Sequence, residues 1–155
     1  INEADALTDT HSENDYGRKA VDTLLKAMED HRDDFIVIAA GYPELLAHFG
    51  DSNPGLRSSV NKHIYFEDYR VEELYEIFKR MCENTGYILT SEALDHSYKV
   101  FEQKYENRGK NFANGREVRN YFEKAIMKQA DRMFFVKNPS DEELCTILVA
   151  DVQDI

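Results

Sequence analysis

The sequence of 155 residues predicts an α/β segment, residues 1–68, followed by an all-helical segment, residues 69–155. Two observations lead to this division. Residues 35–40 form a short continuous apolar run, which is typical of a strand buried on both faces in a parallel sheet, and residues 63–66 predict a second short strand. Beyond residue 69, apolar side chains instead recur every three or four positions, which is the period of helices. We therefore expect a partial α/β subdomain, with helices packed on parallel strands, joined to a helical subdomain.

The first segment is expected to alternate helices with strands. Residues 18–34 predict an amphipathic helix, because apolar side chains fall at i, i+3, i+4 and i+7. This stripe consists of Val21, Leu24, Leu25 and Met28. The strand at 35–40 ends at Gly41, and Pro43 suits the first turn of a short helix through Phe49. Residues 50–55 have turn chemistry and lead to the second strand at 63–66.

The second segment is expected to begin with two helices. The first has an apolar stripe at residues 71, 74, 78 and 81 and stops near Gly86. The second can be capped by Thr90 or by Ser91, because both side chains carry a hydroxyl that accepts a hydrogen bond from the helix N-terminus. Its stripe follows at residues 94, 98, 101 and 105.

A third helix is expected from Asn114 to about Phe134, with its inward face at residues 118, 122, 125 and 126. Asn114 is expected to cap it, with Glu117 at the third helical position as in a capping box. Residues 138–140 break the chain. Residues 144–149 predict either a strand or a short extended segment, and Asp151 is expected to cap a last helix that runs to the end of the chain.

Composition excludes several classes of protein. The chain has 19 Lys and Arg against 30 Asp and Glu, a net charge of −11, which argues against broad nucleic-acid binding. It has no apolar run of about eighteen residues and no signal-peptide pattern, so we expect no membrane segment and a cytoplasmic protein. Its two cysteines lack CxxC spacing, which favours a reducing compartment, and its five histidines lack the spacing of metal ligands.

Five motifs stand in the order and spacing of one family. They are residues 1–7 (INEADAL), 16–30 (YGRKAVDTLLKAMED), 37–43 (VIAAGYP), 52–58 (SNPGLRS) and 112–120 (FANGREVRN). With these motifs the chain resembles the AAA+ ATPases of the branch that contains red-type rubisco activase and stage V sporulation protein K. The resemblance implies an α/β large subdomain, a helical lid, ATP with Mg²⁺ bound between them, and a hexameric ring that remodels a protein client.

The same resemblance implies that the glycine-rich phosphate loop and a pore loop belong to a part of the parent protein outside these residues. We therefore expect no ATPase activity from the 155-residue chain alone, because the phosphate loop supplies most of the contacts to the β- and γ-phosphates.

The resemblance assigns roles to residues of the first segment. Glu3 falls at the catalytic carboxylate that ends a Walker B strand and polarises the attacking water. Asn2 falls at the family's Mg²⁺-associated aspartate, but its amide oxygen carries no charge, so Mg²⁺ binding through water should be weakened. Arg57 matches an arginine that can reach the γ-phosphate of a neighbouring subunit, while Ser59 fills the place of a second arginine. A surface or intersubunit ion pair is an equally good explanation for Arg57.

In the second segment, Arg116 resembles the sensor-2 arginine of the lid, which contacts the phosphates of ATP. Its expected place in the first turn of a helix supports a function, since the positive helix end disfavours a cation there. The alternative is pairing with an acid such as Glu123, and Arg119 is expected to be structural. Tyr42 is a candidate for the sensor-1 position, with a packed ring as the alternative. The loop at 9–15 faces either a ring pore or solvent.

Three functions remain open at this point. The first is ATP-driven remodelling of a protein client by a homo-oligomeric ring. The second is a degenerate module that binds nucleotide or holds a ring together but hydrolyses poorly, because Asn2 and Ser59 are both uncharged. The third is an interaction domain that uses no nucleotide, which the order of the motifs disfavours. No residue identifies the client.

Overall fold

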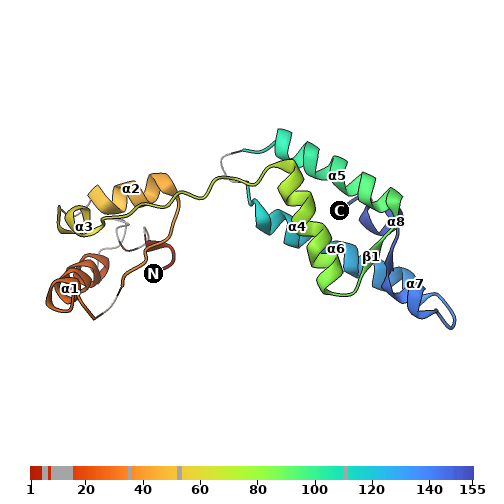
Figure 1. Ribbon diagram of the computed structural model, residues 1–155, viewed down its shortest axis with the longest axis horizontal. Coiled ribbons are helices and arrows are strands. Elements are labelled where there is room, and N and C mark those ends of the chain that lie inside the picture. Colours follow the sequence, from red (N-terminus) through yellow and green to blue (C-terminus); the bar gives the residue numbers. More distant parts are fainter. Residues whose placement is uncertain (5–6, 8–15, 35, 52–53, 110–111) are drawn as a thin grey trace. The chain divides into compact units, whose positions relative to one another are not determined.

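The computed structural model describes residues 1–155 apart from residues 5–6, 8–15, 35, 52–53 and 110–111 and the side chain of residue 48. The described chain divides into two compact units, Ile1–Phe66 and Glu67–Ile155 (Figure 1). Each unit has its own buried cluster of apolar side chains and therefore its own core. The predicted class is confirmed: parallel pairing with packed helices comes first, and a helical lid follows.

The described part of unit 1 contains the helices α1 (Tyr16–Asp30), α2 (Pro43–Asp51) and α3 (Pro54–Ser59). Each contributes one buried side chain, Val21, Phe49 or Leu56, to a small core that also holds Ala4. Pro43 opens α2 as predicted, because its fixed φ suits a first turn that needs no N–H donor.

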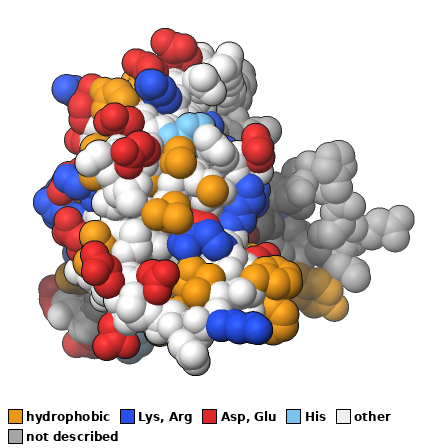
Figure 2. All heavy atoms as spheres, turned by 90° about the vertical axis from the view of Figure 1, so that its right-hand side faces the viewer, with side chains coloured by type: hydrophobic (Ala, Val, Ile, Leu, Met, Phe, Trp, Pro, Cys, Tyr) orange, Lys and Arg blue, Asp and Glu red, His pale blue; other side chains and the backbone are white. Residues whose placement is uncertain are grey.

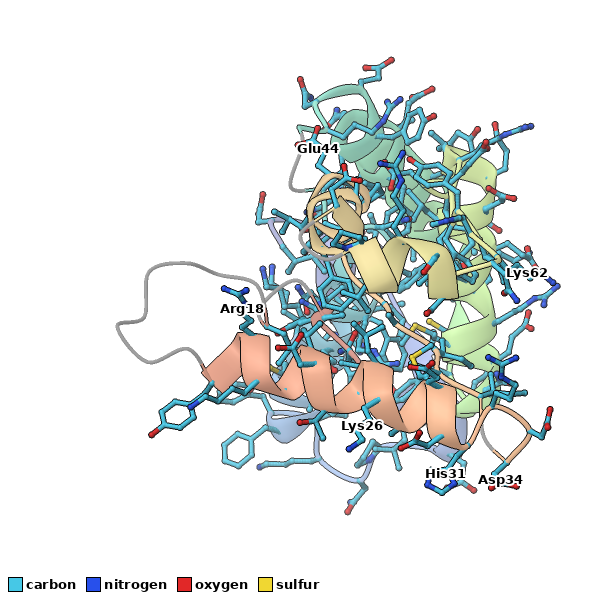
Figure 3. The ribbon with its side chains drawn as sticks, turned by 90° about the vertical axis from the view of Figure 1, so that its left-hand side faces the viewer. Arg18, Lys26, His31, Asp34, Glu44 and Lys62 are labelled. Atoms are coloured by element: carbon cyan, nitrogen blue, oxygen red, sulfur yellow. The ribbon has the colours of Figure 1, made fainter. Side chains whose placement is uncertain are left out.

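The helix predicted over residues 18–34 starts earlier than expected and ends at Asp30. A turn follows, in which the N–H of Asp34 donates to the carbonyl of His31 at 3.0 Å. Figure 3 shows the His31 and Asp34 side chains close together beyond the end of α1, and His31 Nδ1 lies 3.4 Å from Asp34 Oδ2. These local bonds satisfy polar groups just beyond the end of α1, and in a longer helix the same backbone groups would form helical hydrogen bonds.

The parallel pairing in unit 1 is a single bridge between Asn2 and Ala40. The N–H of Ala40 donates to the carbonyl of Ile1 at 2.9 Å, and the N–H of Ala4 donates to the carbonyl of Ala40 at 3.1 Å. The N-terminal amine adds a bond of 2.7 Å to the carbonyl of Ile38. The two segments therefore run in the same direction, and both leave the bridge at the same end.

The predicted burial of the first strand of unit 1 was wrong, and so was the prediction of a strand at residues 63–66. In the first run, Ile36 is 88% exposed and Ile38 is 74% exposed. In the second run, residues 63–66 belong to no strand, and Phe66 is 87% exposed. An apolar run becomes a buried strand only where neighbours pair with its edges and cover its faces. Within the described residues of unit 1, the first run has one such neighbour, residues 1–4, and the second has none.

Unit 2 is a helical bundle. Its long helices are α4 (Val71–Asn84), α5 (Ser91–Glu106) and α6 (Gly115–Phe134) (Figure 1). The short helices α7 (Asp141–Cys145) and α8 (Val149–Val152) follow. A two-stranded parallel sheet joins β1 (Ile88–Leu89) to β2 (Thr146–Ile147), with Ile88 opposite Thr146. The three long helices confirm the periodicity argument for this half of the chain.

Local signals explain both the correct and the missed helix ends of unit 2. Thr90 caps α5 as predicted, accepting a 3.3 Å hydrogen bond from the N–H of Ala93. Gly86 follows α4 with a φ of 81°, a conformation that costs glycine little. The prediction passed over α7, although Ser140 and Glu143 form a complete capping box at its start.

Asp151 does not cap a last helix, contrary to the prediction. It is the third residue of α8, and its carboxylate accepts a 2.9 Å hydrogen bond from the N–H of Leu148, the residue that precedes the helix. The helix ends at Val152, before the end of the chain. Leu148 precedes the helix because the Asp151 carboxylate bonds back to its N–H from the third helical position, and the same carboxylate also pairs with Arg132 of α6 at 2.8 Å.

Three aromatic rings form the centre of unit 2. Phe78 of α4, Phe101 of α5 and Tyr121 of α6 meet edge to face, with centroid separations of 5.0 to 5.7 Å, and each is at most 2% exposed. The Tyr121 hydroxyl donates to the carbonyl of Val152 at 3.1 Å, which ties α8 to this core. The rings therefore hold together helices that are distant in sequence.

Cys82 lies in the same core, and its thiol is expected to make stability depend on pH. Its side chain is 0% exposed, and burial raises the pKa of the thiol to about 12 from an ordinary value of 9.0. Between these two values the unfolded chain has lost the proton and the folded chain retains it. The free energy of unfolding therefore falls as pH rises from about 9 toward 12.

We expect Cys82→Ala to remove this dependence. The stability advantage of the wild type over the variant should shrink by about 1.4 kcal/mol for each pH unit above pH 9, measured by urea denaturation. Cys145→Ala controls for the loss of a thiol outside the core. Parallel stability curves for wild type and Cys82→Ala would contradict the prediction.

Candidate functional site

The first candidate residues lie at one end of the parallel bridge in unit 1. The bridge sets Asn2 beside Ala40, and Glu3 and Gly41 follow at the same end. In α/β proteins, ligands bind just beyond the carboxyl ends of parallel strands. The Asn2 and Glu3 side chains are exposed, and Glu3 has a φ of 53°, which turns the chain out of the extended path. The Glu3 carboxylate is therefore open to a ligand and is not sealed in the core.

The oxygens at this end suit a metal only in company with a phosphate ligand. The described residues contain no group of three or more His, Cys, Asp or Glu side chains placed to hold a metal ion. Mg²⁺ in nucleotide sites keeps several waters and needs one or two protein oxygens besides the phosphates. Asn2 offers an amide oxygen and Glu3 a carboxylate at adjacent exposed positions, which fits a Mg²⁺ that arrives with its nucleotide.

Arg57 and Ser59 lie on α3. Arg57 Nη1 is 3.6 Å from Asp51 Oδ1, and the two side chains are 79% and 66% exposed. This is the surface ion pair that the sequence offered as the alternative role for Arg57. Exposed pairs of this kind contribute little to stability, so the guanidinium can exchange Asp51 for another anion at low cost. Contact between Arg57 and a phosphate stays a prediction.

Arg116 lies in the first turn of α6 with its side chain exposed. Among the residues that the structure describes, its guanidinium has no hydrogen bond or ion-pair partner, and the alternative pair with Glu123 is not formed. The neighbouring acid, Glu117, is occupied by Lys104 of α5 at 3.1 Å. A cation that protrudes from the positive end of a helix is well placed to bind an anion.

Asn114 does not cap α6, contrary to the prediction. Its side chain makes no capping hydrogen bond, and its φ and ψ are 53° and −124°. Its Oδ1 instead accepts from the N–H of Tyr69, and its Nδ2 donates to Asp68 Oδ1, both at 3.1 Å. The chain before α4 offers one donor and one acceptor, and the amide uses both of its ends there. Sequence patterns miss this contact because the partners are 45 and 46 residues away.

The sequence also singled out Tyr42 and the loop at residues 9–15, and the structure describes only the first of them. Tyr42 is 67% exposed, so the alternative of a packed ring was wrong. The loop at 9–15 lies outside the described residues. On the wider surface, Figure 2 shows acidic and basic side chains intermixed on the face that it presents, without a continuous basic area. Every helix that the structure describes is too short or too polar to cross a lipid bilayer.

Residues 70–155 match the family model described as AAA lid domain. The chain is 41% identical to the protein CfxQ homolog of Trieres chinensis, covering 98% of this chain and 52% of that protein. It is 41% identical to protein CbbX of Cereibacter sphaeroides, covering 86% and 43%. It is also 41% identical to the chloroplastic ribulose bisphosphate carboxylase/oxygenase activase of Cyanidioschyzon merolae, covering 98% and 52%. The chain thus spans about half the length of these relatives.

Proposed function

The chain belongs to the AAA+ ATPases of the red-type rubisco activase branch. We therefore propose that it is part of a motor protein that binds ATP with Mg²⁺ and hydrolyses the ATP to remodel a protein client. One relative is named for such a client, ribulose bisphosphate carboxylase/oxygenase. The family generally forms oligomeric rings, and we propose a homo-oligomeric ring here. The free cysteines favour a reducing compartment, so we place the protein in the cytoplasm.

The observation that carries the proposal is the exposed Glu3 carboxylate at the end of the parallel bridge, in a chain whose second unit is an AAA lid. In the proposal, Glu3 orients the attacking water and accepts its proton. Arg116 binds phosphate oxygens, and Arg57 neutralises charge on the γ-phosphate of a neighbouring subunit. Asn2 holds Mg²⁺ through a water, and that ion, when bound with ATP, offsets the charge of the phosphates.

Two uncharged residues favour a second candidate function. Asn2 and Ser59 both occupy exposed positions where the family resemblance implies a charged side chain. A neutral ligand weakens the hold on Mg²⁺, and a serine cannot neutralise a phosphate. The second candidate is therefore a degenerate module that binds nucleotide or supports a ring without efficient hydrolysis.

The substitution Asn2→Asp in the full-length natural protein tests the first candidate function, the working motor. For a working motor, the variant should raise turnover at limiting Mg²⁺ by roughly tenfold or less, a change of about 1.4 kcal/mol, because it strengthens an ion contact that already functions. Phosphate release at steady state measures this rate. Asn84→Asp, at the exposed end of α4, is the matched control.

The wild-type rate decides between the candidates. Turnover well above background in the wild type supports the motor. No turnover in the wild type, with activity only after Asn2→Asp is combined with Ser59→Arg, supports the degenerate module. A wild type that does not hydrolyse ATP, does not bind it and does not form a ring contradicts both.

A further inference from the structure

We propose that Asn114 is a positioning residue, which holds Arg116 ready for a phosphate by tying the first turn of α6 to the chain that enters α4. The inference rests on the nucleotide-binding role proposed above for Arg116. It assigns to Asn114 a task that is separate from helix capping, and it gives Asp68 and Tyr69 a part in the same task.

The tie consists of contacts on both sides of the start of α6. The side chain of Asn114 bonds to the N–H of Tyr69 and to the carboxylate of Asp68. The next residue, Gly115, lies beside the Tyr69 ring, where a Cβ would be at an ordinary van der Waals separation of 3.6 Å. Figure 1 shows the start of α6 beside the beginning of α4, where these contacts are made. Asn114 therefore joins the start of α6 to two adjacent residues of the chain that enters α4.

The backbone of Asn114 indicates that the tie is strong enough to impose an unfavourable conformation. A φ of 53° with a ψ of −124° matches the first central position of a type II′ turn, which glycine normally occupies. Other residues persist in such conformations only where the surrounding contacts over-determine them, and such strain concentrates at functional sites. The only polar side-chain contacts of Asn114 among the described residues are those to Asp68 and Tyr69.

The effect of the tie is to fix the backbone around Arg116 while its side chain stays available. The N–H of Arg116 donates to the carbonyl of Ala113, and the N–H of Glu117 donates to the carbonyl of Asn114, both at 2.9 Å. Glu117 is held further by Lys104. A phosphate that meets Arg116 then has to order one side chain and no backbone, which lowers the entropic cost of binding.

The tie itself is tested on the 155-residue chain by amide hydrogen exchange, without nucleotide. Asn114→Gly keeps the backbone conformation available and removes both side-chain bonds. The Tyr69 amide should then exchange at least roughly tenfold faster, a change of about 1.4 kcal/mol in opening free energy, while amides in the middle of α6 stay unchanged.

A charge exchange across the tie provides a rescue. Asn114→Asp sets two carboxylates against each other and should also expose the Tyr69 amide. Adding Asp68→Asn supplies a side-chain N–H₂ that can donate to the new carboxylate at position 114. Slow exchange of the Tyr69 amide should therefore be restored. Unchanged Tyr69 exchange in Asn114→Gly, or no rescue in the double variant, would overturn the tie.

The link to Arg116 is tested in the full-length natural protein by a double-mutant cycle on the affinity for a fluorescent ATP analogue. Asn114→Gly should weaken binding by roughly three- to tenfold, within the range of couplings between neighbouring residues. In an Arg116→Ala background it should have no further effect. Circular dichroism confirms that each variant is folded at the temperature of the assay.

The outcomes separate this inference from the proposed function. Independent, additive losses from the two variants, with normal binding by the wild type, overturn the positioning role of Asn114 alone. No binding of the ATP analogue by the wild type overturns the proposed function, and the positioning role falls with it, whatever the exchange of the Tyr69 amide.

Discussion

Glu3→Gln in the full-length natural protein is expected to lower ATP turnover by roughly 10²- to 10⁴-fold, the usual contribution of a positioned general base. The amide keeps the size of the side chain and loses the ability to accept a proton. Because Glu3 is exposed at the end of the parallel bridge and supports no core packing, the variant should fold normally. It should also keep an affinity for ATP close to that of the wild type.

Steady-state phosphate release measures the rate, and binding of a fluorescent ATP analogue measures the affinity. The matched control is Glu29→Gln, which makes the same change at an exposed acid of α1. Its turnover should equal that of the wild type. Equal turnover in Glu3→Gln and wild type would remove Glu3 from the reaction.

Asp151→Ala is expected to destabilise unit 2 by about 3 kcal/mol, the low end of the usual effect of removing one partner of a buried ion pair, because the Arg132 side chain is 26% exposed. The Asp151 side chain is 2% exposed, and its two oxygens accept from Arg132 Nε at 2.9 Å and Nη2 at 2.8 Å. It also accepts from the N–H of Leu148. The variant leaves the partly exposed guanidinium of Arg132 and the N–H of Leu148 without this partner.

Urea denaturation of the 155-residue chain measures this loss. Hydrogen bonding to Asp151 raises the pKa of Arg132 above its already high ordinary value, so the stability that comes from this shift is fully present at neutral pH and is lost as the pH rises through the raised pKa in strong alkali. The control, Asp131→Ala, removes an exposed acid of α6 and should change stability by about 0.5 kcal/mol or less. Equal losses from the two substitutions would show that the pair is not a structural element.

The lid helices could be predicted because their signals are local. The stripe at 71–81, the hydroxyl cap at Thr90 and the glycine after α4 all act within one or two helical turns of where they stand. The capping box of Ser140 and Glu143 is equally local, but residues 138–140 were predicted only to break the chain, so α7 was missed.

The strands of unit 1 could not be predicted from their own residues. Whether residues 36–40 are buried depends on which segments lie beside them. The sequence alone does not show that, within the described residues, their only strand-like pairing is the bridge between Ala40 and Asn2. Asn114 presents the same difficulty. Its amide can cap a helix or join two backbones, and a partner 45 residues away decided between these roles.

The candidate site was predicted mainly from motif order, and a local chemical argument supported only Arg116. Glu3, Asn2, Arg57 and Arg116 were identified by resemblance, and the structure adds that each of these side chains is exposed. The residues that arrange Arg116 were missed, since neither Asp68 nor Tyr69 belongs to a motif. Residues that touch a ligand tend to form short signatures, whereas the residues that support them are scattered along the chain.

The exposed isoleucines of unit 1 bear on how the protein behaves in concentrated solution. Ile36 and Ile38 lie in an uncharged segment that, among the described residues, pairs only with residues 1–4, and a second molecule can add to such a segment as a further strand. Aggregation of the 155-residue chain should therefore start at residues 36–40. A lysine in place of Ile36 blocks this growth while leaving the bridge between Asn2 and Ala40 intact.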